Sequence, residues 1–270
     1  MSVAASEGPA RVSLRPALVK GWKRNLPWML PVGTALATLL LWEIVVRVFS
    51  VPQVILPPPS AIGAEFVRIM PLLLQHASQT GMESLVALLL AATLGAVIAG
   101  VMASIPLARD VLQPNLVALQ LIPKIALAPM FIIWLGIDSS SRLAFAVFLS
   151  FFPIVIAASA GLAQADETAI RLCRSLTASP LQTFFRVRVP FALPHFFNGL
   201  RIASTMAVIG VIVAEFISSR VGLGHYILYA SSRMETTGIF AALLMLCIVG
   251  LGLFGGVVLI ERLVRDRYLR

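Results

Sequence analysis

The chain has 270 residues, of which 59% are hydrophobic and only 12% are charged, whereas a soluble domain carries about 25% charged residues. One soluble core of this length cannot bury so much apolar surface, so the composition excludes an ordinary soluble protein. The net charge of +9 would suit a nucleic-acid binder only if the basic residues formed a solvated face. They lie instead at the ends of apolar segments, which is the pattern of a membrane protein.

Six apolar segments have about the length, roughly 20 residues, that a helix needs to cross the ~30 Å hydrocarbon core. Backbone groups must find their hydrogen bonds inside lipid, so these segments predict helices. The first segment is long enough to span and is interpreted as a retained helix, not a signal peptide. The predicted spans are residues 28–49, 79–103, 111–136, 142–162, 201–219 and 239–260.

The predicted fold class is therefore all-α, a polytopic membrane protein with about six transmembrane helices. The predicted organisation is a basic N-terminal tail over residues 1–27, one transmembrane domain over 28–265, and a short tail over 266–270. A long polar loop over residues 163–200 interrupts the transmembrane domain.

The distribution of basic residues predicts the orientation of the chain. With six spans, both tails and the 163–200 loop lie on one side, together with most of the 21 Lys and Arg residues. By the positive-inside rule that side is cytoplasmic. The other side would carry Arg47, Arg68, Arg142, Arg220 and Arg233.

The segment between the first two spans is rich in proline. Pro57, Pro58 and Pro59 remove backbone donors and favour an extended chain. Ser60 can then cap a short helix from Ala61 to about Leu74. We expect this segment to lie along the outer membrane surface.

The 163–200 loop predicts two short helices. Asp166 and Glu167 suit the first turn of one helix, where the helix dipole favours negative charge. Ser179 begins the other helix, because Ser179 and Gln182 have the spacing of a capping box and a proline follows the cap.

The second loop helix carries apolar side chains at helical spacing. Leu181, Phe184 and Phe185 are expected to share one face, and Pro190 is expected to end the helix. That face either packs on the chain's own helix ends or fits a groove on a partner protein.

Four ionisable residues fall within or near the spans, where charge is costly and usually faces the bundle interior. They are Glu43, Glu83, Lys124 and Glu215. Lys124 lies between two prolines, so its helix is expected to be interrupted near a pathway. Lys124 either attracts an anionic solute or forms a structural pair with Glu83 or Glu215.

Small residues recur four positions apart in several spans, a spacing that lets helices approach closely, within the chain or between two copies. The alternative is the ordinary use of Gly and Ala in membrane helices. The pairs are Gly95 with Ala99, Ala96 with Gly100, Gly210 with Ala214, and Gly252 with Gly256.

The sequence holds no P-loop and no motif of nucleophilic or metal catalysis. The two cysteines are far apart, and no histidine has a partner at metal-ligand spacing. We expect the chain not to be an enzyme, to hold no metal or other cofactor, and to leave any ATP hydrolysis to another subunit.

Several segments, in order over roughly residues 30–265, resemble the permease subunits of ABC importers, most closely the nitrate, sulfonate and taurine branch. The segments are Leu56–Ser60, Ile122–Gly136, Phe151–Ile154, Leu176–Pro194, Asn198–Ala203, Ala214–Ile217 and Gly222–Gly224. The resemblance implies the type I ABC importer permease fold. It also implies that the 163–200 loop docks on an ATPase subunit.

The family's docking signature is only partly present. Arg171, Leu172 and Cys173 stand where the family has Glu-Ala-Ala, and Thr177 stands where it has Gly. Glycine tolerates positive φ, which a β-branched residue does poorly. The residues carried over as ATPase-docking are Ser179, Pro180, Leu181, Gln182, Phe184, Phe185 and Arg186.

The function implied by this resemblance is the permease of an ATP-driven importer in a bacterial inner membrane. The solute would be a small organic anion such as a sulfonate, taurine or nitrate, with Lys124, Glu83 and Glu215 in the pathway. The implied partners are ATPase subunits that bind ATP and magnesium, a periplasmic or surface binding protein, and a second permease copy.

Three alternatives stay open at this point. The chain could be an ion-coupled secondary transporter that uses the four ionisable residues as a relay, although no pair of repeated halves supports this. It could belong to the same permease class with another solute, such as a vitamin or a pyrimidine precursor. A membrane-embedded enzyme would need clustered reactive groups, and none is evident.

Overall fold

A computed structural model describes residues 17–268, with side chains over 30–267. Most of the predicted N-terminal tail and the last residues of the C-terminal tail therefore lie outside the described residues. Residues 17–27, which we predicted as tail, are helical and belong to the first helix.

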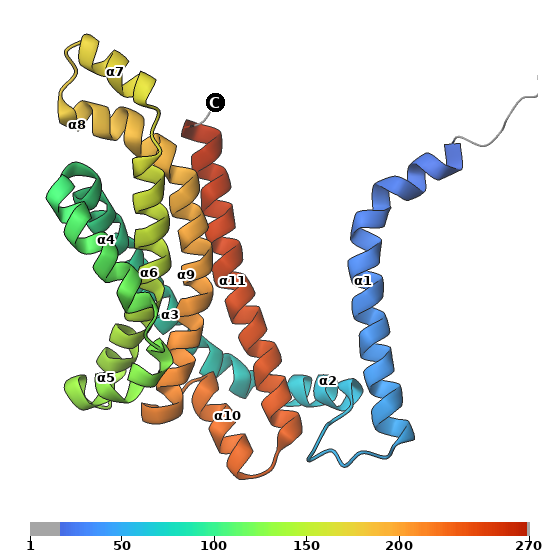
Figure 1. The fold of residues 1–270 in the computed structure, drawn as a ribbon. Coiled ribbons are helices and arrows are strands. Elements are labelled where there is room, and N and C mark those ends of the chain that lie inside the picture. Colours follow the sequence, from blue (N-terminus) through green and yellow to red (C-terminus); the bar gives the residue numbers. More distant parts are fainter. Residues whose placement is uncertain (1–16, 269–270) are drawn as a thin grey trace, which may run out of the picture. The chain divides into compact units, whose positions relative to one another are not determined.

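Every regular element over residues 17–268 is helical, which confirms the predicted all-α class. Figure 1 shows the helices in chain order. They are α1 (Ala17–Val48), α2 (Pro59–Arg68), α3 (Met70–Ser104), α4 (Pro106–Gln120), the 3₁₀ turn η1 (Lys124–Leu127), α5 (Ala128–Leu135), α6 (Ser139–Ala163), α7 (Glu167–Ser175), α8 (Pro180–Thr183), the π-turn η2 (Phe184–Arg188), α9 (Val189–Ser218), α10 (Leu223–Ser232) and α11 (Thr236–Tyr268).

Five helical stretches are long and apolar enough to cross a membrane. They are Leu30–Val48, Met70–Ser104, Ser139–Ala163, Pro180–Ser218 and Thr236–Arg267. A sixth candidate is the pair formed by Pro106–Gln120 and Lys124–Leu135, which bends by 91°. The prediction of about six spans is confirmed, and the expected interruption at Lys124 is present.

Two predicted boundaries in the outer segment were wrong. The short helix ends at Arg68, and α3 begins at Met70, well before the predicted residue 79. The break falls there because Pro71 occupies the first turn of α3, where a missing amide hydrogen costs nothing. Ser60 lies inside α2 and does not cap it.

The chain divides into two compact units, one up to Ala61 and one from Ile62 onward. Within the first unit, Glu43 accepts hydrogen bonds from the amide and hydroxyl of Ser60, at 3.0 and 2.7 Å. Arg47 donates to the same carboxylate at 2.6 Å. The polar end of α1 thus holds the proline-rich segment that follows it.

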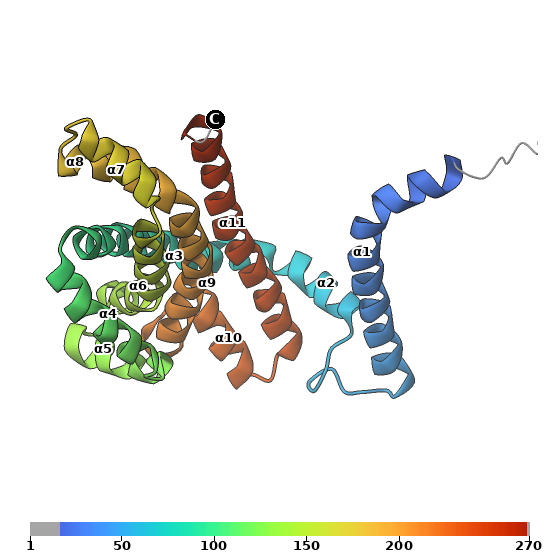
Figure 2. The ribbon, with the colours of Figure 1, turned by 45° about the horizontal axis from the view of Figure 1, so that its top comes forward.

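In the second unit, α3, α6 and α9 pack around a common core, with α11 beside α9 (Figures 1 and 2). Close approach depends on glycine: a Cβ at Gly210 of α9 would lie 2.7 Å from the Cα of Ala146 in α6. A Cβ at Gly95 of α3 would lie 2.7 Å from Ile154. Gly252 and Gly256 of α11 have no neighbour within 4 Å of such a Cβ.

Candidate functional site

The second loop helix forms as the sequence predicts. The Ser179 hydroxyl accepts a bond from the Gln182 amide at 3.2 Å, and the Gln182 side chain accepts one from the Ser179 amide at 2.8 Å. This is a complete capping box. In the preceding helix, Asp166 caps α7 by accepting from the Thr168 amide at 2.8 Å.

The prediction that Pro190 ends this helix was wrong. The chain passes from α8 through the π-turn η2 directly into α9, so one helical stretch runs from Pro180 to Ser218. In η2 the Val189 amide donates to the Phe184 carbonyl, five residues back. The wider π-turn relieves the clash that a proline ring makes with the carbonyl four residues earlier.

The three apolar side chains of this helix lie in different environments. Leu181 and Phe185 are exposed, at 68% and 61% of their surface. Phe184 is half-buried and packs against the core cluster that includes Ala99 and Met102. The rings of Phe184 and Phe185 meet edge to face at 5.2 Å. Leu181 and Phe185 thus form an exposed apolar pair, and Phe184 anchors it to the chain.

The residues that depart from the family signature lie at the end of α7. Leu172 is 59% exposed, and Cys173 is half-buried. Thr177 has φ of +59°. The Ala178 amide donates to the Cys173 carbonyl and the Thr177 amide to the Arg174 carbonyl, which is a Schellman motif. Thr177 therefore adopts the left-handed conformation for which glycine is the usual residue.

A cleft of about 1130 Å³ lies beside the loop helices and the adjoining end of α3. Its walls are mainly apolar and include Val101, Phe184 and Phe196, with Arg174 and Arg188 also at its edge. The Arg188 guanidinium donates to the Ala103 carbonyl at 2.6 Å, at the last turn of α3. This contact ties the loop helices to a transmembrane helix.

Lys124 begins η1 at the break between α4 and α5. Its Nζ lies 4.7 Å from the centroid of the buried Phe152 ring of α6, a cation–π contact. Among the ion pairs of the described residues, none involves Lys124, and Glu83 and Glu215 have other partners. The predicted alternative of a pair with either carboxylate is therefore not formed.

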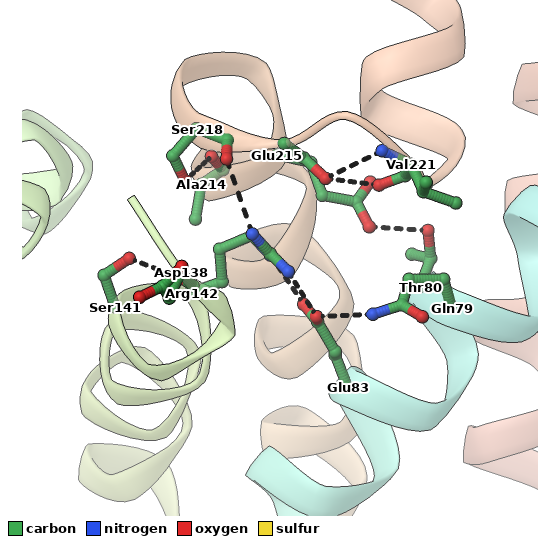
Figure 3. A network of polar contacts seen from close by, with 12 residues as sticks. Gln79, Thr80, Glu83, Asp138, Ser141, Arg142, Ala214, Glu215, Ser218 and Val221 are labelled. Carbon is green, nitrogen blue, oxygen red and sulfur yellow. Dashed lines mark hydrogen bonds and ion pairs between the residues drawn. The ribbon is translucent and has the colours of Figure 1, made fainter. Parts of the chain in front are cut away.

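Glu83, Arg142 and Glu215 lie together at the meeting point of α3, α6 and α9 (Figure 3). Each side chain belongs to a residue that is less than a tenth exposed. Arg142 donates to Glu83 through two nitrogens, at 2.7 and 2.9 Å, and to the Ser218 carbonyl at 3.4 Å. Because both partners are buried, removing one would leave an unpaired charge at a cost of about 3–5 kcal/mol.

Glu215 has a different set of partners. One carboxylate oxygen accepts from the Thr80 hydroxyl at 2.7 Å, and the other accepts from the Gly224 amide at 2.7 Å. Gly222 has φ of +123°, and a Cβ there would overlap the Glu215 carboxylate. The glycines of the Gly222–Gly224 segment are therefore required by the close approach of Glu215.

Three residues of this region were not predicted as site residues. Arg142 was assigned to the outer side, because it lies at the edge of its apolar segment. His76 precedes the predicted start of its span at residue 79, and Thr80 lies in the first turn of that span without a charge to draw attention to it. The available signal was the charge imbalance: carboxylates inside the predicted spans need a cation, and Arg142 stands at the first position of a predicted span.

The comparisons with known proteins agree with this architecture. Residues 91–266 match the family described as the binding-protein-dependent transport system inner membrane component. A probable ABC transporter permease protein of Haemophilus influenzae is 35% identical, over 80% of this chain and 88% of its own length.

Two other relatives carry the names of solutes. The formylaminopyrimidine transport permease protein of Halalkalibacterium halodurans is 32% identical, over 89% of this chain and 96% of its own length. The taurine transport system permease protein of Escherichia coli is 27% identical, over 84% of this chain and 86% of its own length. With its bundle of apolar helices and its matched residues 91–266, the chain belongs to the inner membrane permease components of binding-protein-dependent ABC transport systems.

Proposed function

We propose that this chain forms the transmembrane pathway of an ATP-driven importer and performs no catalysis of its own. ATP and magnesium are bound by separate ATPase subunits, and a binding protein delivers the solute on the other side of the membrane. The observation that carries the proposal is the exposed pair Leu181 and Phe185 on a helix with a complete N-terminal capping box, which continues through η2 into the transmembrane helix α9.

The proposed docking surface consists of the exposed face of α8 and η2. An exposed apolar pair on a rigid helix is costly in water and fits a groove on a partner. Ser179, Pro180, Gln182 and Arg186 are also exposed, and all but the proline add polar groups to the same short segment. Phe184 is not part of the exposed face; it packs on the chain's own core cluster and thereby holds the docking surface in place.

The proposed orientation places the 163–200 loop and both termini in the cytoplasm, as the positive-inside rule predicts. In the second unit, α7, α8 and the end of α11 lie at the same end of the bundle (Figure 1). This arrangement supports a common side for the loop and the C-terminus.

The proposed working unit contains two permease copies that rock between inward-open and outward-open states as the ATPase dimer closes and opens. The test is purification of the permease together with the ATPase of the same system. We expect stable recovery of the complex and transport in vesicles that stops when the ATPase is inactivated. Transport that persists and follows an ion gradient would instead support a secondary transporter.

The proposed solute is a small organic anion such as a sulfonate, taurine or nitrate, and Lys124, Glu83 and Glu215 belong to the pathway. The position of Lys124 supports an anionic solute. Lys124 begins η1 at a break in a helix, and among the described residues it forms no ion pair with a carboxylate. The two carboxylates lie buried where α3, α6 and α9 meet (Figure 3), and charged groups inside a membrane bundle commonly mark a pathway. The formylaminopyrimidine relative favours a pyrimidine precursor as the second candidate.

Substitution of Lys124 tests the pathway assignment. We expect Lys124→Ala to lower the transport rate at least tenfold while complex assembly is unchanged, because the charge acts on the solute and not on docking. Lys124→Arg keeps the charge and should retain more transport. Uptake of radiolabelled taurine and of a labelled aminopyrimidine measures both solute candidates. Equal transport by wild type and Lys124→Ala would remove Lys124 from the pathway.

A further inference from the structure

The first amides of α10 are held by side chains from other helices. Such amides have no partner within their own helix. The Gly222 amide donates to Nδ1 of His76 at 3.0 Å, the Leu223 amide to the Thr80 hydroxyl at 2.9 Å, and the Gly224 amide to Glu215 at 2.7 Å. We call these three acceptors, His76, Thr80 and Glu215, the α10 clasp.

The helix α10, whose N-terminus the clasp holds, lies at the end of the bundle opposite α7 and α8 (Figures 1 and 2). Only four residues, 219–222, connect α9 to α10, and three connect α10 to α11. Leu223, Tyr226 and Ala230 of α10 are buried in a core cluster with Leu73 of α3. The apolar face therefore holds the body of α10, and the clasp fixes its N-terminus to α3 and α9.

The three acceptors differ in how they respond to acid. An imidazole Nδ1 accepts a hydrogen bond only when the ring is neutral and carries its proton on Nε2. A protonated His76 would point an N–H at the Gly222 N–H, and the bond would be lost. The Thr80 hydroxyl does not titrate, and the Glu215 carboxyl retains acceptor oxygens in both protonation states. Among the three acceptors, His76 is therefore the one that a single protonation prevents from accepting its hydrogen bond.

The groups facing His76 come from several elements. From α10, the His225 ring lies 6.3 Å and the Tyr226 ring 5.6 Å from the His76 ring. From α9, Glu215 binds Thr80, which is one helical turn from His76. Burial, followed by the charge of Glu65 on α2 and then that of Glu235, raises the pKa of Tyr226, so its phenol stays neutral in mild acid. His225 is the other imidazole beside His76, so it is the residue that a control variant must replace.

We propose that His76 is a pH-sensitive positioning residue. Neutral His76 holds the elbow between α9 and α10, which is the four-residue connection 219–222. Protonation of His76 releases the Gly222 amide and loosens the N-terminus of α10. The bond is present at higher pH and is lost as pH falls through the range where imidazoles titrate, about pH 5–8. Mild acid on this side of the membrane then slows transport without affecting docking at the other end. The effect on transport rests on the proposed function, whereas the clasp itself does not.

Hydrogen exchange of the segment 219–226 tests the clasp in the purified complex of permease and ATPase. After correction for the intrinsic effect of pH on exchange, protection at Gly222 should fall roughly fivefold between pH 8 and pH 5.5, the effect of losing one hydrogen bond. In His76→Asn the amide oxygen accepts in place of Nδ1 and does not titrate, so protection should stay constant. His225→Asn should behave as wild type.

Protection in wild type that does not change with pH would overturn the proposal, and so would pH dependence that survives His76→Asn or disappears in His225→Asn. Nitrogen NMR of wild type gives an independent check that needs no variant, since Nδ1 of His76 must be unprotonated at pH 8. Uptake by the same complex is measured in parallel. If ATP drives no uptake in any variant, the proposed function fails, while the exchange result still decides the role of His76.

Discussion

Thr177 shows how a single residue at the end of α7 can hold local strain. Its left-handed φ of +59° closes a Schellman motif with the amides of Thr177 and Ala178. Non-glycine residues pay about 1–2 kcal/mol for this conformation. The sequence identified the position as a departure from the family, and the structure explains why glycine is favoured there.

Thr177→Gly should stabilise the end of α7. The left-handed conformation is free for glycine, although the added freedom of the unfolded chain offsets part of the gain, so we expect a net gain of about 1 kcal/mol or less. Hydrogen exchange at Ala178 should slow by up to about fivefold. Thr177→Ala is the control, since it removes the branched side chain and keeps the strained backbone. Faster exchange in Thr177→Gly would contradict this account.

Phe184 and Phe185 are neighbours with different roles, and substitution should separate them. Phe185→Asp places a charge on an exposed position, so it should weaken ATPase recovery at least tenfold and leave permease stability nearly unchanged. Phe184→Asp buries a charge against the cluster that includes Ala99, so it should also lower thermal stability by several kcal/mol. Co-purification and thermal unfolding measure the two effects. Equal stability losses in both variants would contradict the assignment.

Helix packing in the second unit depends on close contact at particular glycines. Gly210 of α9 touches the backbone of Ala146 in α6, whereas Gly252 of α11 has open space around it. The spacing of small residues in the sequence found both positions but could not distinguish them, because periodicity alone does not say which face meets a neighbour.

Gly210→Val and Gly252→Val form a matched pair. At Gly210 the larger side chain would overlap Ala146, so we expect a loss of about 1–3 kcal/mol in stability. At Gly252 we expect almost no change in the isolated permease. Thermal unfolding in detergent measures both. A loss of dimer in Gly252→Val, with unchanged monomer stability, would show that this face of α11 contacts another copy.

At the scale of the whole molecule, the number and length of the apolar segments in the sequence predicted the all-α class and the number of spans. It did not predict where the helices begin, because the local backbone geometry around prolines decides this. Pro71 is tolerated in the first turn of α3, where its missing amide hydrogen has no partner to lose. At Pro190 the π-turn η2 lets the helix continue. The charges in the spans indicated that a cation was needed, but not that Glu83 pairs with Arg142, because the two residues are 59 positions apart in the sequence.

The cysteines offer a test of the proposed orientation. In Cys247→Ala, the half-buried Cys173 of α7 is the remaining thiol of the chain. A membrane-impermeant maleimide should label Cys173 in inside-out vesicles and not in right-side-out vesicles, because the loop is proposed to be cytoplasmic. Detergent-solubilised protein controls for reactivity. Labelling only from the outside would reverse the topology.

The unbroken helix from Pro180 to Ser218 has a mechanical consequence. Its 39 residues, at a rise of about 1.5 Å each, give a helical path about 58 Å long, with the π-turn η2 and Pro194 within it. The docking pair lies near one end, and Glu215, which holds Gly224, lies near the other. A continuous helix transmits a displacement along its length, and the π-turn and Pro194 are the points at which this one can bend. A displacement by a partner at Phe185 would therefore travel to the N-terminus of α10 through one continuous helix, and the bend at the π-turn and Pro194 would set how much of it arrives.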